Sequence, residues 1–177
     1  MAIILSEMDK AFIGEIRERG GFDIRACVQC GKCAATCPLS LAGFPFYIKK
    51  LIHAIECGMR EEIMEDPSMW ACQSCNRCVE VCPQDVKPYE VLLALRRAAV
   101  RELSVPGNTI EGLRNYYKTG HAVYPKGYQA KRKAVGLSEE PPSTLSFPEM
   151  LEQLQEFLRN SELNEVGLFP MKKEEKK

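Results

Sequence analysis

Long hydrophobic runs are absent from the 177-residue sequence. No stretch reaches the roughly 18 apolar residues that a transmembrane helix requires, so no membrane span is predicted. The apolar residues 2–5 are too few for a signal peptide, no basic region precedes them, and Glu7 and Asp9 follow them closely. We therefore expect a cytoplasmic protein without a membrane anchor.

An excess of charge of either sign is also absent. Lys and Arg together number 24, and Asp and Glu together number 24, so the formal net charge is zero. Nucleic acids and anionic membrane surfaces attract a basic patch, which this composition does not provide. We expect neither nucleic acid nor membrane among the partners of this chain.

The sequence lacks the motifs of most redox enzymes. No G-x-G-x-x-G follows a predicted strand, so no dinucleotide-binding site is predicted. No C-x-x-x-x-C-x-x-C spacing of the plant type occurs, and no two cysteines are adjacent. Without a flavin site or a catalytic constellation, the chain is not expected to make or break substrate bonds itself.

Cysteine, in contrast, is abundant, with nine residues in the chain. In a sequence without an export signal, grouped cysteines indicate metal or redox chemistry rather than disulfides. Eight of them form a duplicated motif, C-x-x-C-x-x-C-x-x-x-C followed by proline, in which the second copy lies 45 positions after the first. The first run comprises Cys27, Cys30, Cys33, Cys37 and Pro38, and the second comprises Cys72, Cys75, Cys78, Cys82 and Pro83.

This spacing is typical of ligands to [4Fe–4S] clusters. A structural zinc site, the alternative, usually draws on two separated C-x-x-C pairs. In proteins with two clusters, the fourth cysteine of each run binds the cluster of the other run. We therefore predict one cluster held by Cys27, Cys30, Cys33 and Cys82, and a second held by Cys72, Cys75, Cys78 and Cys37. Such a chain would carry electrons as a non-catalytic subunit of an oxidoreductase.

The apolar pattern between and around the two runs predicts helices. Ile48, Leu51, Ile52 and Ile55 recur at i, i+3, i+4 and i+7 within 46–56, and Gly58 is placed to end that helix. Further helices are predicted over 6–19, 61–65, 89–103, 108–118 and 147–159. Three of them carry an apolar stripe: Met8, Phe12 and Ile16 in the first; Leu92, Leu95, Ala99 and Leu103 in the third; and Phe147, Met150, Leu151, Leu154, Phe157 and Leu158 in the last. The last stripe suits a core or a partner-docking face, and we favour the core. Three N-terminal caps are predicted from Ser6, from Asn108 with Glu111, and from Ser146 with Glu149.

No segment alternates as a strand does, so we predict an all-α protein. Its centre would be an α-helical ferredoxin-like domain with helical extensions at both ends. The predicted divisions are an N-terminal helix at 1–21, a two-cluster domain at 22–105, a C-terminal extension for partner docking at 106–170 and a disordered tail at 171–177.

Several single residues outside the eight motif cysteines are also interpreted. Lys32 and Arg77 occupy equivalent positions in the two runs, where they either tune a reduction potential or are ordinary surface charges. Trp70, two residues before Cys72, is predicted to shield a cluster from water. The ninth cysteine, Cys57, carries no sign of an activated thiol, and we assign no role to His53.

The segments 22–38 and 70–83, which contain the two cysteine runs, resemble the C subunit of the heterodisulfide reductase family of methanogenic archaea. The resemblance extends over about residues 5–145 and is most specific over 24–91. The cysteine runs alone are shared with many respiratory iron–sulfur proteins, and the small size of the chain favours the C subunit.

The resemblance implies a role and a set of partners. The C subunit of that family takes electrons from the A subunit, which contains flavin and iron–sulfur clusters. It passes them to the B subunit, which cleaves the disulfide between coenzyme M and coenzyme B, and a hydrogenase or formate dehydrogenase joins the larger complex. The extension after residue 105 would then dock on the B subunit. The alternatives are an electron relay in another respiratory or sulfur-metabolism complex and a structural zinc-binding module.

Overall fold

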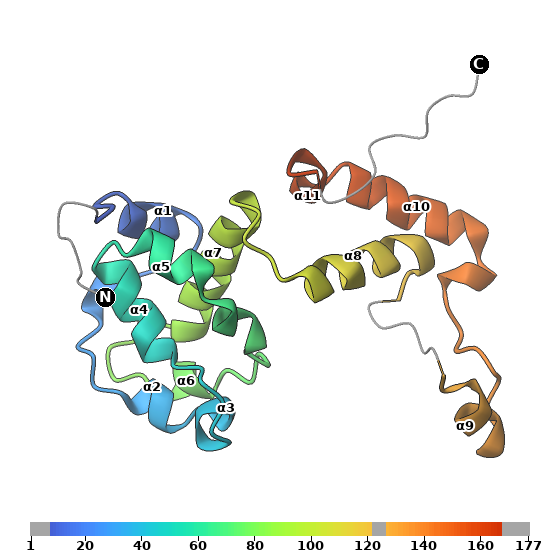
Figure 1. Cartoon of the computed structure of the whole chain (residues 1–177), viewed down its shortest axis with the longest axis horizontal. Helices are drawn as coiled ribbons and strands as arrows, with labels where there is room; N and C mark the ends of the chain where they lie inside the picture. The colour runs from blue at the N-terminus through green and yellow to red at the C-terminus, as the bar shows by residue number, and fades with distance from the viewer. Residues whose placement is uncertain (1–7, 122–126, 168–177) are drawn as a thin grey trace. The chain divides into compact units, whose positions relative to one another are not determined.

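The computed structural model describes residues 8–121 and 127–167. All regular elements in these ranges are helices and none is a strand, which confirms the all-α prediction (Figure 1). The chain divides into two compact units, Met1–Val105 and Pro106–Lys177. Within the described ranges, no helix combines the length and the apolar character needed to span a membrane.

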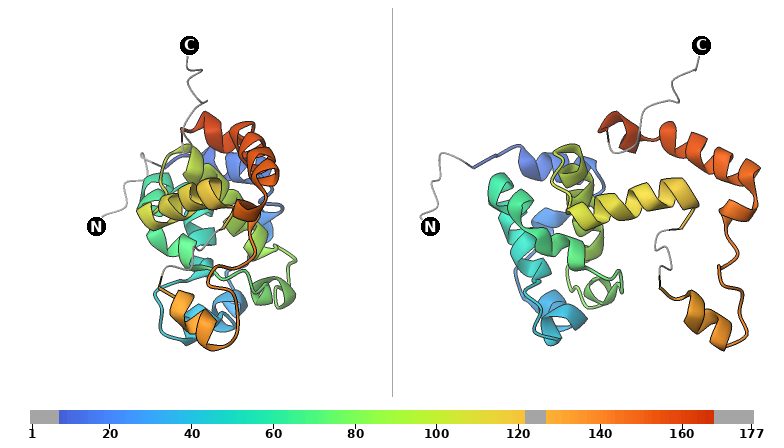
Figure 2. Two further views of the ribbon diagram at one scale, coloured as in Figure 1. Left: turned by 90° about the vertical axis from the view of Figure 1, so that its right-hand side faces the viewer. Right: turned by 45° about the vertical axis from the view of Figure 1, so that its right-hand side comes forward.

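The first unit consists of short helices around one apolar core. Figure 2 shows the unit from two further sides, and in each view α2 lies at the end of the unit opposite α1. The helices α1, α4 and α7 pack against one another in pairs, while α2 packs on α6 and on α4. The elements of the unit are α1 Phe12–Glu18, η2 Ile24–Ala26, α2 Lys32–Ala35, α3 Pro38–Leu41, α4 Ile48–Glu56, α5 Arg60–Glu65, η3 Pro67–Ala71, α6 Arg77–Glu80 and α7 Pro88–Arg101.

Helix α4 carries the predicted apolar stripe into the core. Its four stripe residues, Ile48, Leu51, Ile52 and Ile55, are all buried, as predicted. Gly58 follows the helix with φ of 72° and donates its N–H to Ile55, while the N–H of Met59 reaches Ala54. This arrangement is a Schellman motif. A Cβ atom on Gly58 would lie 2.5 Å from the carbonyl oxygen of Asp9, so glycine is also required by close packing.

Helix α1 is shorter than the predicted helix over 6–19. It begins at Phe12, after a turn that starts at Asp9. The Asp9 side chain accepts the N–H of Ala11 at 2.9 Å, and the Asp9 carbonyl accepts the N–H of Phe12. The predicted cap Ser6 lies outside the described residues. The apolar side chains Phe12 and Ile16 are fully buried, as the stripe predicted.

Helix α7 supplies the other side of the core and ends earlier than predicted. Leu92, Leu95 and Ala99 are buried, in agreement with the predicted stripe. Leu103, predicted on the same stripe, lies past the helix with φ of 57° and is exposed. The chain leaves the helix here because the N–H groups of Leu103 and Ser104 turn back to Val100 and Ala99.

The second unit contains α8 Gly107–Thr119, α9 Gln129–Ala134, η4 Thr144–Ser146, α10 Pro148–Arg159 and α11 Glu162–Glu165. Helix α10 packs against α8, and Gln155 and Arg159 hydrogen-bond to Tyr117 at 3.0 and 2.9 Å. Among the described residues of this unit, only Leu158 is buried.

Both caps predicted in the second unit are wrong. Helix α8 begins after Pro106, and α10 begins after Phe147, in each case without a side-chain cap. Ser146 belongs to η4 instead, where the N–H of Ser146 bonds to Ser143. Proline at the first position of α10 makes a cap less necessary, because it removes one of the unpaired N–H groups. The short helix α9 was not predicted, since its sequence shows no apolar period.

Candidate metal centre

The two cysteine runs adopt matching backbone conformations. In the first run, Gln29 and Gly31 take left-handed conformations with φ of 52° and 81°. Their counterparts in the second run, Ser74 and Asn76, have φ of 58° and 59°. Each run then enters a four-residue helix, α2 or α6, and these two helices pack together. The duplication in sequence is therefore a duplication in backbone geometry.

The left-handed residues are informative because L-residues with side chains rarely adopt this conformation. Gly31 and Asn76 are residue types that tolerate it, whereas Gln29 and Ser74 tolerate it at a cost. A backbone wound in this way curls each C-x-x-C-x-x-C segment around a point.

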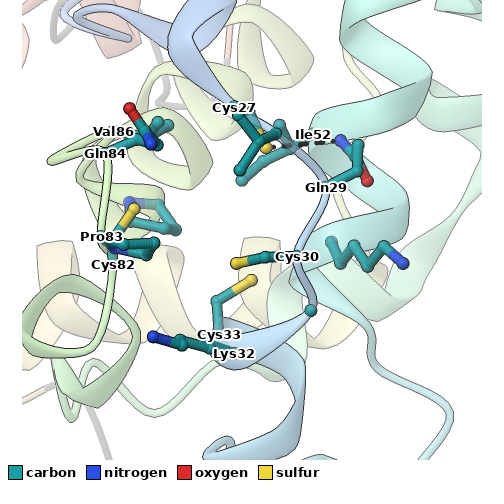
Figure 3. A pocket seen from close by; sticks show the side chains of 14 residues that line it. Cys27, Gln29, Cys30, Lys32, Cys33, Ile52, Cys82, Pro83, Gln84 and Val86 are labelled. Atoms are coloured by element: carbon teal, nitrogen blue, oxygen red, sulfur yellow. Dashed lines mark hydrogen bonds between the residues drawn. The ribbon is translucent and has the colours of Figure 1, made fainter.

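Cys82 of the second run lies beside three cysteines of the first. Figure 3 shows the hollow that these four residues line, with the sulfur atoms of Cys30 and Cys33 directed into it. Apolar groups such as Ile52 and Val86 complete the wall. The set that surrounds the hollow is Cys27, Cys30, Cys33 and Cys82. Four thiols around one compact space fit the donor requirement of a [4Fe–4S] cluster.

Three cysteines of the second predicted set are also neighbours. The pKa of the Cys78 thiol responds to the charges of Cys72 and Cys75, and to that of Cys33 from the first run. The two ligand sets are therefore adjacent where α2 meets α6. Cys37 is the residue before α3 and is half-buried against the core. Its partnership with Cys72, Cys75 and Cys78 stays a prediction. Among the described residues, no three His, Cys, Asp or Glu side chains are grouped to hold a single metal ion.

Burial raises the pKa of several thiols. For Cys78 the pKa rises to about 12, because desolvation and neighbouring thiols both disfavour the thiolate. Burial also raises the pKa of Cys33 and of Cys27, and the Glu56 carboxylate adds to the effect at Cys27. Iron binds the thiolate form, so loading of these sites must release protons.

Polar groups around the cysteines were not predicted from the sequence. Gln29 donates from its side chain to the Cys27 sulfur at 3.4 Å and to Glu56 at 2.9 Å (Figure 3 shows the first bond). In the second run, Tyr89 and Ser74 hydrogen-bond through their hydroxyls at 2.9 Å. The bonds from Gln29 to Glu56 and from Tyr89 to Ser74 join residues distant in sequence, so neither motif nor period could have indicated them.

Arg96 of α7 supports the start of the second run. Its guanidinium donates to the carbonyl of Met69 at 2.7 Å and to that of Cys72 at 3.3 Å, and it lies 5.5 Å from the ring of Trp70. Trp70 is half-buried against the core, and its predicted role in shielding a cluster stays a prediction.

Lys32, the first residue of α2, is exposed and lines the hollow (Figure 3), so its positive charge lies near the first candidate ligand set. Its counterpart Arg77, the first residue of α6, is also exposed. The effect of either charge on a reduction potential stays a prediction. The sulfur of Cys57 lies 3.7 Å from Nε2 of His53, one helical turn earlier on α4. His53 is exposed, so this contact is open to solvent.

Comparisons with known proteins agree with this geometry. Residues 23–86 match the family model of the 4Fe-4S dicluster domain. A protein of Archaeoglobus profundus, named as like the C subunit of heterodisulfide reductase, is 48% identical over 94% of this chain and 88% of its own length. The C subunit of the H(2):CoB-CoM heterodisulfide,ferredoxin reductase of Methanothermobacter thermautotrophicus is 38% identical, over 86% and 82%. The iron-sulfur C subunit of the CoB–CoM heterodisulfide reductase of Methanopyrus kandleri is 28% identical, over 92% and 84%. The chain therefore belongs to the family of heterodisulfide reductase C subunits.

Proposed function

We propose that this chain holds two [4Fe–4S] clusters and carries electrons from a flavin-containing iron–sulfur partner, the A subunit, to a catalytic partner, the B subunit. The B subunit would reduce the heterodisulfide of coenzyme M and coenzyme B, in a complex that also contains a hydrogenase or a formate dehydrogenase. The observation that carries the proposal is the hollow in which Cys82 meets Cys27, Cys30 and Cys33. The names of the relatives support the choice of reaction.

When bound, each cluster would supply reversible transfer of one electron. The chain's own residues would hold it and limit its contact with water. The thiols of Cys27, Cys30, Cys33 and Cys82 are the proposed ligands of the first cluster, and those of Cys72, Cys75, Cys78 and Cys37 are the proposed ligands of the second. Buried apolar side chains behind the first hollow, Ile52 and Val86, lower the local dielectric.

Crossed ligation would also stabilise the fold. A cluster held by both runs joins residues far apart in the sequence, as a disulfide does, and the free energy of metal binding becomes free energy of folding. Because α2 and α6 already pack together, little rearrangement is needed for each run to reach the cluster of the other. We propose the α-helical ferredoxin-like arrangement for 22–105 on this basis.

The C-terminal unit is proposed to dock on the B subunit. Phe147, Met150 and Phe157 are 61% to 71% exposed; Phe147 directly precedes α10, and Met150 and Phe157 lie on it at helical spacing. Acidic residues, Glu149, Glu152 and Glu156, accompany them on the exposed surface of the helix. An apolar helix face with an acidic border is suited to an apolar groove bordered by basic residues on a partner.

The experiment that tests the electron-transfer role is a redox titration followed by electron paramagnetic resonance. The chain would be purified without oxygen and its iron and sulfide measured. We expect about eight irons per chain and two reducible signals that interact magnetically, since two cubane clusters hold four irons each. Zinc in place of iron, or iron that stays oxidised throughout the titration, would overturn the proposal.

The partners are tested separately, by purification of the tagged chain from its native host. Recovery of the A and B subunits is the expected result. Recovery of a membrane cytochrome instead would retain the electron-transfer role and replace the heterodisulfide reductase complex with another respiratory one.

A further inference from the structure

Gln29 is held in an unfavourable backbone conformation next to a proposed cluster ligand. Its φ of 52° lies in the left-handed region, which costs free energy for a residue with a side chain. In return, its side-chain amide reaches the sulfur of Cys27 at 3.4 Å. Gln29 therefore directs a side-chain N–H group at this sulfur.

Glu56, the last residue of α4, holds this amide in place. Its carboxylate accepts a hydrogen bond from the same Nε2 atom of Gln29 at 2.9 Å. This bond is partly buried, so water screens the carboxylate charge of Glu56 and the amide dipole of Gln29 less than it would at an exposed site. The Nε2 atom lies 2.9 Å from the carboxylate and 3.4 Å from the Cys27 sulfur, so one amide group separates the negative charge from this sulfur. The amide and the carboxylate thus act on the same sulfur with opposite sign.

The second run lacks this arrangement although its backbone matches. Ser74, the counterpart of Gln29, is exposed and bonds to the hydroxyl of Tyr89 at 2.9 Å. The two runs match in spacing and conformation, and the surroundings of the first cysteine are one place where they differ.

We propose that Gln29 and Glu56 are positioning residues that set the reduction potential of the cluster at Cys27 and make it unequal to the second cluster. This inference rests on the proposed function, in that the chain must first hold the two clusters. N–H groups directed at a cluster sulfur raise its potential, because they stabilise the extra negative charge of the reduced state. A nearby carboxylate lowers the potential, because it repels that charge.

The test is a pair of substitutions with opposite expected signs. Gln29→Leu keeps a side chain of similar size and removes the amide donor, so the potential of one cluster should fall. Glu56→Gln keeps a hydrogen-bonding partner for Gln29 and removes the charge, so the potential of the same cluster should rise. In each case we expect about a tenfold change in the reduction equilibrium, or about 59 mV for a one-electron couple. Ser74→Ala is the matched control and should leave this cluster unchanged.

The measurement is the midpoint potential of each cluster in the anaerobic full-length chain, from a titration followed by electron paramagnetic resonance, with iron content measured in parallel. A role limited to packing would not shift the potential in opposite directions in two variants that both keep their iron. If Gln29→Leu loses iron, Glu56→Gln alone decides the question, and an unchanged or lower potential overturns the inference. If the unmodified chain holds no reducible clusters, the proposed function itself fails. If the unmodified chain holds both clusters and neither variant shifts a midpoint potential, only this inference fails.

Discussion

The two units of the chain differ in how they are stabilised. The first unit contains all nine cysteines and every buried apolar residue of the described chain except Leu158. Apart from the 14-residue α7, its helices are short, and several are only four residues long, so helix propensity contributes little by itself. The second unit contains α8 and α10, of 13 and 12 residues, but of its described residues only Leu158 is buried.

This difference indicates two kinds of role. The first unit has a core and a set of candidate metal ligands, and both tie together residues far apart in sequence. The second unit lacks the burial that normally offsets the loss of conformational entropy on folding. A helical segment of that kind gains most of its stability from a partner surface, which agrees with the docking role proposed for it.

The largest effect that would distinguish the units is expected from the crossed ligands. Cys82→Ser should remove about half of the iron, and the lost cluster should be the one held by Cys27, Cys30 and Cys33. Iron analysis and electron paramagnetic resonance of the variant give the result. The counterpart Cys37→Ser should remove the other cluster. If Cys82→Ser instead destroyed the signal assigned to Cys72, Cys75 and Cys78, the crossed assignment would be wrong.

A core substitution should separate the units by stability. Leu95 on α7 is fully buried, so Leu95→Ala should lower the free energy of unfolding by about 3 kcal/mol through lost burial and a cavity. The matched variant in the second unit is Phe157→Ala, at a side chain that is 71% exposed. It should change the stability of the isolated chain by less than about 0.5 kcal/mol. Chemical denaturation followed by circular dichroism measures both, and equal losses would contradict the comparison.

A smaller effect is expected at a charged cluster that ties three elements of the first unit together. Arg60 of α5 bonds to Asp9 at 2.6 Å, to Glu15 of α1 and to Glu102 after α7, and it lies 4.5 Å from the ring of Phe12. Arg60→Ala should lower the free energy of unfolding by about 2 kcal/mol, since each partner is partly exposed and the bonds are weakened by water. The control in the second unit, Arg159→Ala, removes a single bond to Tyr117 and should cost under about 1 kcal/mol.

Low pH should remove the stability that the bonds between Arg60 and its carboxylate partners contribute. The hydrogen bond from Arg60 lowers the pKa of the Asp9 carboxyl group. At Glu15, burial raises the pKa, but the hydrogen bonds from Arg60 and Arg19 outweigh burial, so the pKa of Glu15 is also lowered. Groups whose pKa is lower in the folded state stabilise it above their unfolded values and lose that effect as the pH falls through the folded values. The stability difference between the unmodified chain and Arg60→Ala should therefore be constant near neutral pH and shrink below about pH 4. A difference that grew in acid would contradict this account.

Several features of the first unit could be predicted because their signals are local. The stripe of α4 and the stop at Gly58 follow from residues within one or two helical turns, and both are confirmed. The caps predicted at Asn108 and Ser146 were wrong because a residue type that suits a cap does not show at which residue the helix will begin. The apolar stripe of α10 was expected mainly in a core, yet Phe147 and Phe157 are exposed. Periodicity shows that a helix has an apolar face but not what covers it.

The sequence by itself determined the duplicated cysteine motif, the cluster type that this spacing predicts and the helical character of the chain. These features depend on the spacing of residues along the chain, and covalent geometry fixes that spacing. Only the tertiary structure decided that Glu56 holds Gln29 against Cys27 and that Arg60 gathers carboxylates from three segments. Such contacts depend on how α1, α4 and α7 pack, and packing reflects the shapes of many side chains at once rather than any pattern in one segment.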